Sequence, residues 1–564
     1  MIILGVHDAH NASAALLIDG KIVGAVQEER FTRVKNHHIF PTKSIEWLLS
    51  SNEIDPSDVT KAVLCGYHSA KSGGRDSLKK AYSQSESLSA KLKMAIYYNT
   101  PLGSVYRGMR KSERIASLAK LGFRKEQVTF EEHHHLHACA AYYSNGNFDE
   151  RALVLTVDGQ GDGLCGTVNI AEQNQIERIA EISQSDSFGN MYGMITYIMG
   201  MTPLEHEYKV MGLAPYASEY TTEKGQELFD GLFEIDSGSI IWKRRKLPPA
   251  LQGYRSYQRL LENVRFDTIA AGAQWLVENI MGRWVTNCIQ HTGISNVILS
   301  GGVAMNVKAN KIIMEIPTLD SLFVMPSGGD ESNPIGACYE QFVKEGGDLS
   351  ELKPLEDLYL GPEYSPDKLL NGIDENIYEI KSTANASSEV GKMVAEGEIV
   401  AICRGRTEFG ARALGNRSIV ADPSNPENVR TINDMIKKRD FWMPFAPSIL
   451  DQNESDYIVN PKRITAPYMI ITFDTTDRRN ELVAALHPYD MTTRPQVVYE
   501  DWNPHYYSII REFKNKTNIG GVLNTSFNLH GYPIVNSPED AMFVLEESGL
   551  KHLLLDGYIV SKTK

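Results

Sequence analysis

Residues 152–163 read ALVLTVDGQGDG, and this stretch decides the fold. Its first six residues are apolar or β-branched, which predicts a buried strand. The strand ends at Asp158 and passes into a glycine-rich turn. Two more strand-like runs follow, at residues 166–170 and 176–182. We therefore expect a strand, a polar turn and a hairpin in succession.

The same plan occurs near the N-terminus. Residues 2–8 form an apolar run that ends at His7-Asp8, a polar turn follows, and a hairpin turns at Asp19-Gly20. Two copies of this plan are typical of a duplicated RNase H-like (ASKHA/actin-like) α/β fold, whose halves clamp a nucleotide between two polar turns. Chance similarity between common α/β units is the alternative that the pattern leaves open.

A histidine cluster lies between the two copies, where residues 131–138 read EEHHHLHA. On a helix His133 and His137 share one face, so that both imidazoles can reach one ion. Asp158, at a strand tip, is well placed to join them. Two nitrogens with one or more oxygens suit Fe(II), Zn or Mn. The alternative is a solvated histidine face.

Two strand–glycine–helix junctions follow further along. Residues 296–306 read NVILSGGVAMN, and residues 322–337 read LFVMPSGGDESNPIGA. Such junctions present free backbone N–H groups and the positive end of a helix, which suits phosphate or adenosine. The sequence contains neither a GxxxxGKS/T nor a GxGxxG motif, so neither a P-loop nor a Rossmann site is indicated.

Length and composition narrow the class of protein. A chain of 564 residues predicts two to four domains. The net charge of −14 argues against nucleic acid as a partner, because a phosphate-backbone binder needs a basic face. No apolar run approaches the roughly 20 residues of a membrane span, and no signal peptide precedes the first strand. Six scattered cysteines without a CxxC favour unpaired thiols in a reducing cytoplasm.

A second α/β domain is expected from about Leu358, after a charged, glycine-containing linker at residues 345–354. Residues 404–418 read RGRTEFGARALGNRS, with four arginines in an otherwise acidic chain. Guanidinium groups bind phosphate in a bidentate manner, so we expect a phosphate-rich substrate here. A structural salt-bridge cluster is the alternative. We also expect a helix from Asp267, as N-cap, to about Gln290, and a last helix that starts at Ser537-Pro538.

These segments together resemble the O-carbamoyltransferases of antibiotic and nodulation-factor biosynthesis, over essentially the whole chain. The segments that carry the resemblance are His10-Asn11, residues 28–30, His133 with His137, Asp158-Gly159, and residues 209–215, 301–306, 328–330, 412–418 and 524–528. The resemblance implies two domains. Residues 1–350 would be similar to the tRNA threonylcarbamoyl-transferase (an ASKHA fold), and residues 358–564 would be YrdC-like.

The resemblance also implies the reaction. Carbamoyl phosphate would be cleaved in the second domain, and the carbamate would take AMP from ATP, with Mg as its ion, to give carbamoyl-adenylate and pyrophosphate. In the first domain a hydroxyl of a small-molecule acceptor, a natural product or a sugar, would attack the carbonyl and release AMP.

The site residues carried over by the resemblance fall into four groups. His10 would be the general base, since an imidazole suits proton transfer at neutral pH. The ligands of Fe(II), with Zn or Mn as alternatives, would be His133, His137, Asp158 and Asp330. The nucleotide or adenylate would be bound by Lys35, Lys209, Gly212, Gly301, Gly302 and Asn306. Carbamoyl phosphate and ATP in the second domain would be bound by Arg412, Arg417, Lys437, Arg494, Asn524 and Ser526.

One position departs from the family, because Met443 stands where an arginine is common. Either Lys438 or Arg439 compensates, or phosphate binding is weaker. A tRNA-modifying enzyme is the first alternative function, disfavoured by the net charge, and a nucleotide sensor is the second. The sequence does not identify the acceptor. Its specificity is expected to lie in two segments, residues 65–125, which we expect to be a helical insertion, and residues 220–265. The oligomeric state is also open, with a homodimer as one option.

Overall fold

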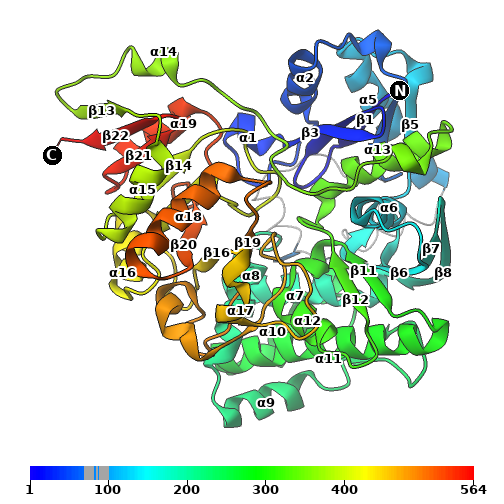
Figure 1. The fold of residues 1–564 in the computed structure, drawn as a ribbon. Helices are drawn as coiled ribbons and strands as arrows, with labels where there is room; N and C mark the ends of the chain where they lie inside the picture. The colour runs from blue at the N-terminus through cyan, green and yellow to red at the C-terminus, as the bar shows by residue number, and fades with distance from the viewer. Residues whose placement is uncertain (69–81, 84–86, 88–100, 564) are drawn as a thin grey trace. The chain divides into compact units, whose positions relative to one another are not determined.

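The computed structural model describes residues 1–68, 82–83, 87 and 101–563 (Figure 1). The chain divides into two compact units. Unit 1 comprises residues 1–28 and 36–355, and unit 2 comprises residues 29–35 and 356–564. Helix α1 (Glu29–Thr32) therefore belongs to the C-terminal unit, although it comes early in the chain.

Unit 1 contains two five-stranded sheets of the same topology. The first has the order β3-β2-β1-β4-β5, and the second has the order β8-β7-β6-β11-β12 when read in the same direction. In each, the first strand pairs antiparallel with the hairpin and parallel with the next crossover strand. The predicted duplicated RNase H-like fold is thereby confirmed. The strands are β1 (Ile2–His7), β2 (Ser13–Ile18), β3 (Lys21–Gln27), β4 (Lys61–Cys65), β5 (Val128–Glu131), β6 (Ala152–Gly161), β7 (Leu164–Glu172), β8 (Gln175–Ser183), β11 (Asn296–Ser300) and β12 (Ser321–Val324).

Two helices lie at the core of unit 1, α6 (His133–Asn145) and α13 (Asn333–Lys344). They approach so closely that a Cβ added at Gly336 of α13 would lie 2.1 Å from the Leu136 carbonyl oxygen of α6. A Cβ at Gly5 of β1 would lie 2.0 Å from the Pro334 carbonyl oxygen. Glycine at both positions therefore lets α13 pack directly on a strand and on a helix.

The other helices of unit 1 are α2 (Thr42–Ser51), α5 (Pro101–Lys120), α7 (Phe188–Ile198), α8 (Glu207–Leu213), α9 (Glu219–Phe229), α10 (Tyr254–Leu261), α11 (Phe266–Thr292) and α12 (Val307–Met314). Helix α11 ends at Thr292, close to the predicted Gln290, and its C-cap Gly293 is in a left-handed conformation with φ 70°. The predicted N-cap is wrong, because Arg265 occupies that position and Asp267 lies in the first turn. Of the expected insertion at residues 65–125, α5 is helical, whereas residues 69–81, 84–86 and 88–100 lie outside the described residues.

Unit 2 is built on one mixed eight-stranded sheet, so it is an α/β domain as predicted. The strand order is β13-β22-β21-β14-β15-β20-β16-β19. The strands are β13 (Tyr378–Ser382), β14 (Val400–Cys403), β15 (Arg417–Ala421), β16 (Ala446–Leu450), β19 (Gln496–Val498), β20 (Gly521–Ser526), β21 (His552–Leu555) and β22 (Tyr558–Lys562).

Helices cover both faces of this sheet. Buried side chains of α15 (Ala386–Ala395) and α18 (Pro504–Thr517) pack on one face, and those of α16 (Glu427–Ile432) and α19 (Pro538–Glu546) pack on the other. Ser537 caps α19, which confirms the predicted last helix.

Two predictions from composition can be compared with the structure. All six cysteines are buried and unpaired, as expected. Among the described residues, none of the helices has the length and apolar character needed to cross a lipid bilayer.

Candidate active site

The metal-ligand candidates come from three separate elements of unit 1. Helix α6 starts at His133, because the Glu132 carboxylate caps it by accepting hydrogen bonds from the His134 and His135 N–H groups at 3.0 and 2.6 Å. The helical period then places His137 on the same face as His133. Asp158 lies on β6 and Asp330 lies in the turn that precedes α13.

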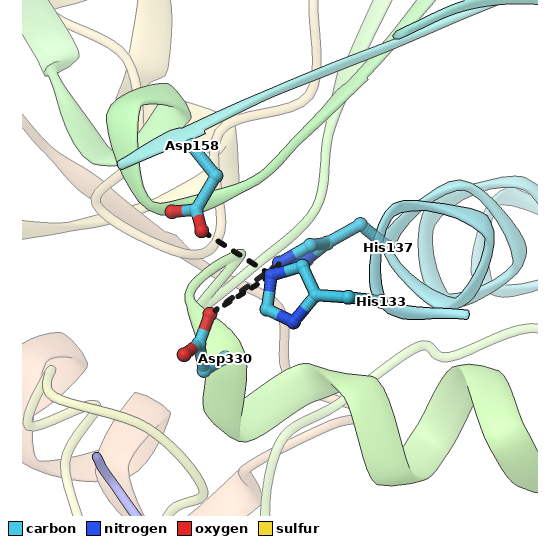
Figure 2. A group of neighbouring side chains, drawn as sticks. All are labelled: His133, His137, Asp158 and Asp330. Carbon is cyan, nitrogen blue, oxygen red and sulfur yellow. Dashed lines mark hydrogen bonds and ion pairs between the residues drawn. The ribbon is translucent and has the colours of Figure 1, made fainter. Parts of the chain in front are cut away.

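The four side chains converge on one point (Figure 2). The Nε2 atoms of His133 and His137 are 3.2 Å apart. Asp158 Oδ2 lies 3.3 Å from His133 Nε2, and Asp330 Oδ1 lies 3.5 Å from the Nε2 atom of each histidine. The structure thus brings together all four predicted ligands.

These distances fit a metal ion. Bonds of roughly 2.0–2.2 Å at tetrahedral angles separate neighbouring ligand atoms by about 3.3–3.5 Å. Two imidazole nitrogens and two carboxylate oxygens suit Fe(II), Zn or Mn equally, so the donor set does not distinguish among the three predicted ions. His137 is fully buried, and among the described residues its Nδ1 atom has no hydrogen-bond partner. Nε2 is therefore the nitrogen of His137 that could bind the ion.

The carboxylates and imidazoles shift one another's proton affinity. Burial alone would lower the pKa of His133, but the negative charges of Asp330 and Asp158 raise it to about 10. Burial opposes ionisation of Asp330, yet the charge of His133 and the hydrogen bond from His137 hold its pKa well below the usual range. Metal binding at His133 would therefore compete with its protonation.

The sequence interpretation missed His7, which borders this cluster. His7 Nε2 lies 3.6 Å from Asp330 Oδ2 and 3.0 Å from the backbone carbonyl oxygen of His10. His10 follows on the turn after β1 and is partly exposed. The signal was available, because His7 ends the first strand of its sheet just as Asp158 lies towards the end of the equivalent strand.

The predicted nucleotide residues of unit 1 fall on two elements. Gly301, Gly302 and Asn306 form the turn between β11 and α12, where the Gly302 N–H donates to Asp158 Oδ1 at 3.0 Å and Asn306 caps α12. This turn therefore supports a metal ligand. Lys209 and Gly212 both lie on α8.

Unit 2 contains a cluster of basic side chains. Lys437 is buried, and its ammonium donates to Asn528 Oδ1 at 2.8 Å and to Ser526 Oγ at 3.2 Å. Burial and the positive charges of Arg439 and Lys35 lower the pKa of Lys437 well below its usual value. Burial and the charges of Arg412 and Arg439 do the same to the pKa of Arg494.

This basic cluster, Lys35, Arg412, Lys437, Arg439 and Arg494, contains two residues, Lys35 and Arg439, that were not among the phosphate ligands expected in the second domain. Lys35 was expected with Lys209 and the glycines of unit 1, but it belongs to unit 2 and acts on Lys437. Of the two residues named as substitutes for the arginine that is absent at Met443, Arg439 lies in the cluster, whereas Lys438 is exposed.

Two of the predicted phosphate ligands, Arg417 and Asn524, form hydrogen bonds to other groups of the protein. Arg417 is 1% exposed, and its guanidinium donates to the carbonyl oxygens of residues 404, 405, 416 and 536. The Asn524 amide nitrogen donates to Ser448 Oγ and to the Ala413 carbonyl oxygen. The donors of the Arg417 guanidinium are therefore engaged by carbonyl groups of the protein.

The chain thus combines a duplicated RNase H-like unit, which carries a His/His/Asp/Asp cluster that could hold a metal ion, with an α/β unit that carries a basic cluster. The family comparison gives it a class. The carbamoyltransferase N-terminus family matches residues 2–339, and the carbamoyltransferase C-terminus family matches residues 391–562. The chain belongs to the carbamoyltransferase family.

Relatives match over most or all of the chain. The uncharacterized protein MJ1051 of Methanocaldococcus jannaschii is 32% identical over 579 residues, covering 100% of both chains. Nodulation protein NolNO of Sinorhizobium fredii is 29% identical over 565 residues, covering 98% of this chain and 79% of its own. Nodulation protein NolO of Bradyrhizobium diazoefficiens is 31% identical over 440 residues, covering 76% of this chain and 78% of its own.

Proposed function

We propose that this carbamoyltransferase is an ATP-dependent O-carbamoyltransferase. Water hydrolyses carbamoyl phosphate to carbamate and phosphate, and a carbamate oxygen then attacks the α-phosphorus of ATP to form carbamoyl-adenylate with loss of pyrophosphate. A hydroxyl of the acceptor then attacks the carbamoyl carbon, AMP leaves, and the hydroxyl proton passes to a base. The acceptor is a small molecule, a natural product or a sugar.

The basic cluster of unit 2 is the observation that carries this proposal. Burial and neighbouring positive charges both disfavour the charged forms of Lys437 and Arg494. An anion with several negative charges relieves this repulsion, and guanidinium groups suit phosphate oxygens. Carbamoyl phosphate and the triphosphate of ATP have this chemistry. We assign them to Arg412, Lys437, Arg439 and Arg494, with Lys35 and Ser526 beside them.

The His/His/Asp/Asp centre and His10 serve the transfer step. When bound at His133, His137, Asp158 and Asp330, a metal ion such as Fe(II) supplies Lewis-acid polarisation. His10 lies on the turn held by His7 and takes the proton of the acceptor hydroxyl. Lys209 and Gly212 of α8, with the turn at Gly301, Gly302 and Asn306, complete the nucleotide-binding part of the proposal.

The alternative acceptor is tRNA, and the chain's charge argues against it. A tRNA-docking surface attracts phosphates through basic residues, whereas this chain carries a net charge of −14. The unpaired thiols are in keeping with a cytoplasmic enzyme.

The test is pyrophosphate release from ATP, with and without carbamoyl phosphate and with no acceptor. We expect release that requires carbamoyl phosphate and falls at least about 100-fold in Lys437→Ala. Lys392→Ala, at an exposed lysine of α15, is the matched control and keeps the parent rate. Release without carbamoyl phosphate, or an unaffected Lys437→Ala, contradicts the proposal.

His10→Ala separates the two steps. It should release pyrophosphate like the parent but lower carbamoyl transfer to an acceptor by about 10²–10⁴-fold. An equal fall in both steps would contradict the role of His10 as the base of the transfer step.

A further inference from the structure

Helix α6 carries a second pair of possible metal ligands, a histidine and a cysteine, on another face. His135 and Cys139 are four residues apart, as His133 and His137 are, but they are rotated by two residues around the helix. Glu340 of α13 faces them. Each of two faces of α6 therefore presents two possible metal ligands to residues 330–344.

The three side chains lie within contact of one another, and Glu340 offers a different carboxylate oxygen to each of the other two. His135 Nε2 lies 2.9 Å from Glu340 Oε1, Cys139 Sγ lies 3.5 Å from His135 Nε2, and Cys139 Sγ lies 3.3 Å from Glu340 Oε2. A tetrahedral zinc ion, with Zn–S of about 2.3 Å and Zn–N or Zn–O of about 2.0–2.1 Å, separates its ligand atoms by about 3.3–3.6 Å. The two separations that involve Cys139 Sγ are close to these values, and the separation between His135 and Glu340 is shorter, so an ion would move these two side chains slightly apart.

We propose that His135, Cys139 and Glu340 form a second metal site, with Zn²⁺ as its ion. Nitrogen, sulfur and carboxylate oxygen together suit zinc, and a water molecule takes the fourth position. Cys139 is fully buried and Glu340 is nearly so, whereas His135 is partly exposed, which gives an ion access from that side. The site is separate from the His/His/Asp/Asp centre and shares none of its ligands.

Lys344 affects the affinity of this site for a metal ion, because it forms an ion pair with Glu340. Its ammonium lies 3.2 Å from Glu340 Oε1 and 2.6 Å from Glu131 Oε1. The side chain is 43% exposed, so it can leave Glu340 and keep Glu131 when an ion binds. The nearby positive charge weakens the site, and removing it should tighten metal binding.

The role of this second site is structural. A zinc ion would join α6 to α13, the two elements that also carry His133, His137 and, in the preceding turn, Asp330. It would thereby fix the distance between the ligands of the first centre. The inference stands independently of the reaction that the first centre performs.

Cobalt tests the site, because a thiolate bound to Co²⁺ gives a charge-transfer absorption band in the near ultraviolet, which the sulfur-free first centre cannot give. We expect the metal-free full-length protein to develop this band on titration with Co²⁺ and to lose it on addition of Zn²⁺. His137→Ala should keep the band, because its site is the other one.

Three variants complete the test. Cys139→Ser, nearly isosteric, should abolish the band, whereas Cys288→Ser, at a buried cysteine of α11, should retain it. Glu340→Gln should keep the band but raise the Co²⁺ concentration at half-saturation at least about tenfold. Lys344→Met should lower that concentration severalfold.

Two results would overturn the proposal. One is a folded parent protein that shows no thiolate–cobalt band at saturating Co²⁺. The other is a band that persists in Cys139→Ser, because it would come from another cysteine. Circular dichroism of each variant shows that a lost band reflects a lost ligand rather than an unfolded chain.

Discussion

His137 is the most deeply buried of the four predicted metal ligands. It is fully buried on α6, and its Nε2 atom faces both His133 and Asp330. His137→Ala should remove one metal ion per chain and lower carbamoyl transfer by at least about 100-fold. Elemental analysis of the purified protein measures the first effect. Unchanged metal content would contradict the assignment, and His291→Ala, at an exposed histidine of α11, is the control.

A partly buried glutamate at the start of α8 gives a prediction on pH. Burial raises the pKa of Glu207 from 4.5 to about 7, although its Oε1 accepts a hydrogen bond from the Leu204 N–H at 2.7 Å. The folded protein therefore holds this proton more tightly than the unfolded chain does. The stability that follows is fully present below about pH 4.5 and is lost as the pH rises through about 7.

Glu207→Gln removes this titration. The free energy of unfolding of the parent should fall relative to that of the variant between these two pH values, as measured by urea titration across a pH series. Glu219→Gln, at an exposed position of α9, should follow the parent at every pH. Parallel curves for the parent and Glu207→Gln would contradict the raised pKa.

At the scale of elements, sequence spacing predicted what depends on neighbouring residues. The i, i+4 histidines follow from local periodicity and are found on α6. The predicted strand is also found, but it runs on through Asp158 to Gly161 instead of ending at Asp158. Arg417 shows the limit, because its role is decided by carbonyl groups at residues 404, 405 and 536 that only the folded sheet brings to it. Asp330 was predicted from the family resemblance and not from spacing, since nothing local links it to α6.

Helix α6 depends on its cap. The Glu132 carboxylate accepts the N–H groups of His134 and His135, and Arg178 Nη2 lies 2.5 Å from its Oε2 atom. Glu132→Ala should lower the free energy of unfolding by about 1–2 kcal/mol. It should also weaken metal binding, because His133 begins the helix. Denaturant unfolding measures the first effect, with Glu172→Ala, at an exposed end of β7, as the control. An unchanged midpoint would show that the cap contributes nothing.

At the scale of the whole molecule, the two units are not consecutive in the chain. After β3 the chain contributes residues 29–35 to unit 2 and then continues in unit 1 from residue 36. Within unit 2 the Arg30 guanidinium donates to the Gly410 carbonyl oxygen at 2.6 Å, and Arg33 donates to the Ile534 carbonyl oxygen at 2.7 Å. The same segment carries Lys35 into the basic cluster. A fragment that starts at residue 356 would therefore lack part of its own domain, which a linear division of the sequence near residues 350–358 does not foresee.

Arg30 tests this interleaved arrangement. It is 2% exposed and pairs with Glu29 at 2.5 Å as well as with Gly410, so Arg30→Ala leaves a carboxylate and a carbonyl group buried without this donor. We expect a loss of about 3 kcal/mol in stability, concentrated in unit 2. Hydrogen exchange followed by mass spectrometry should show faster exchange around residues 405–415 and little change in the sheet of β6 and β7. Arg151→Ala, at an exposed arginine, should leave both regions as in the parent. Faster exchange confined to unit 1 would mean that residues 29–35 support that unit instead.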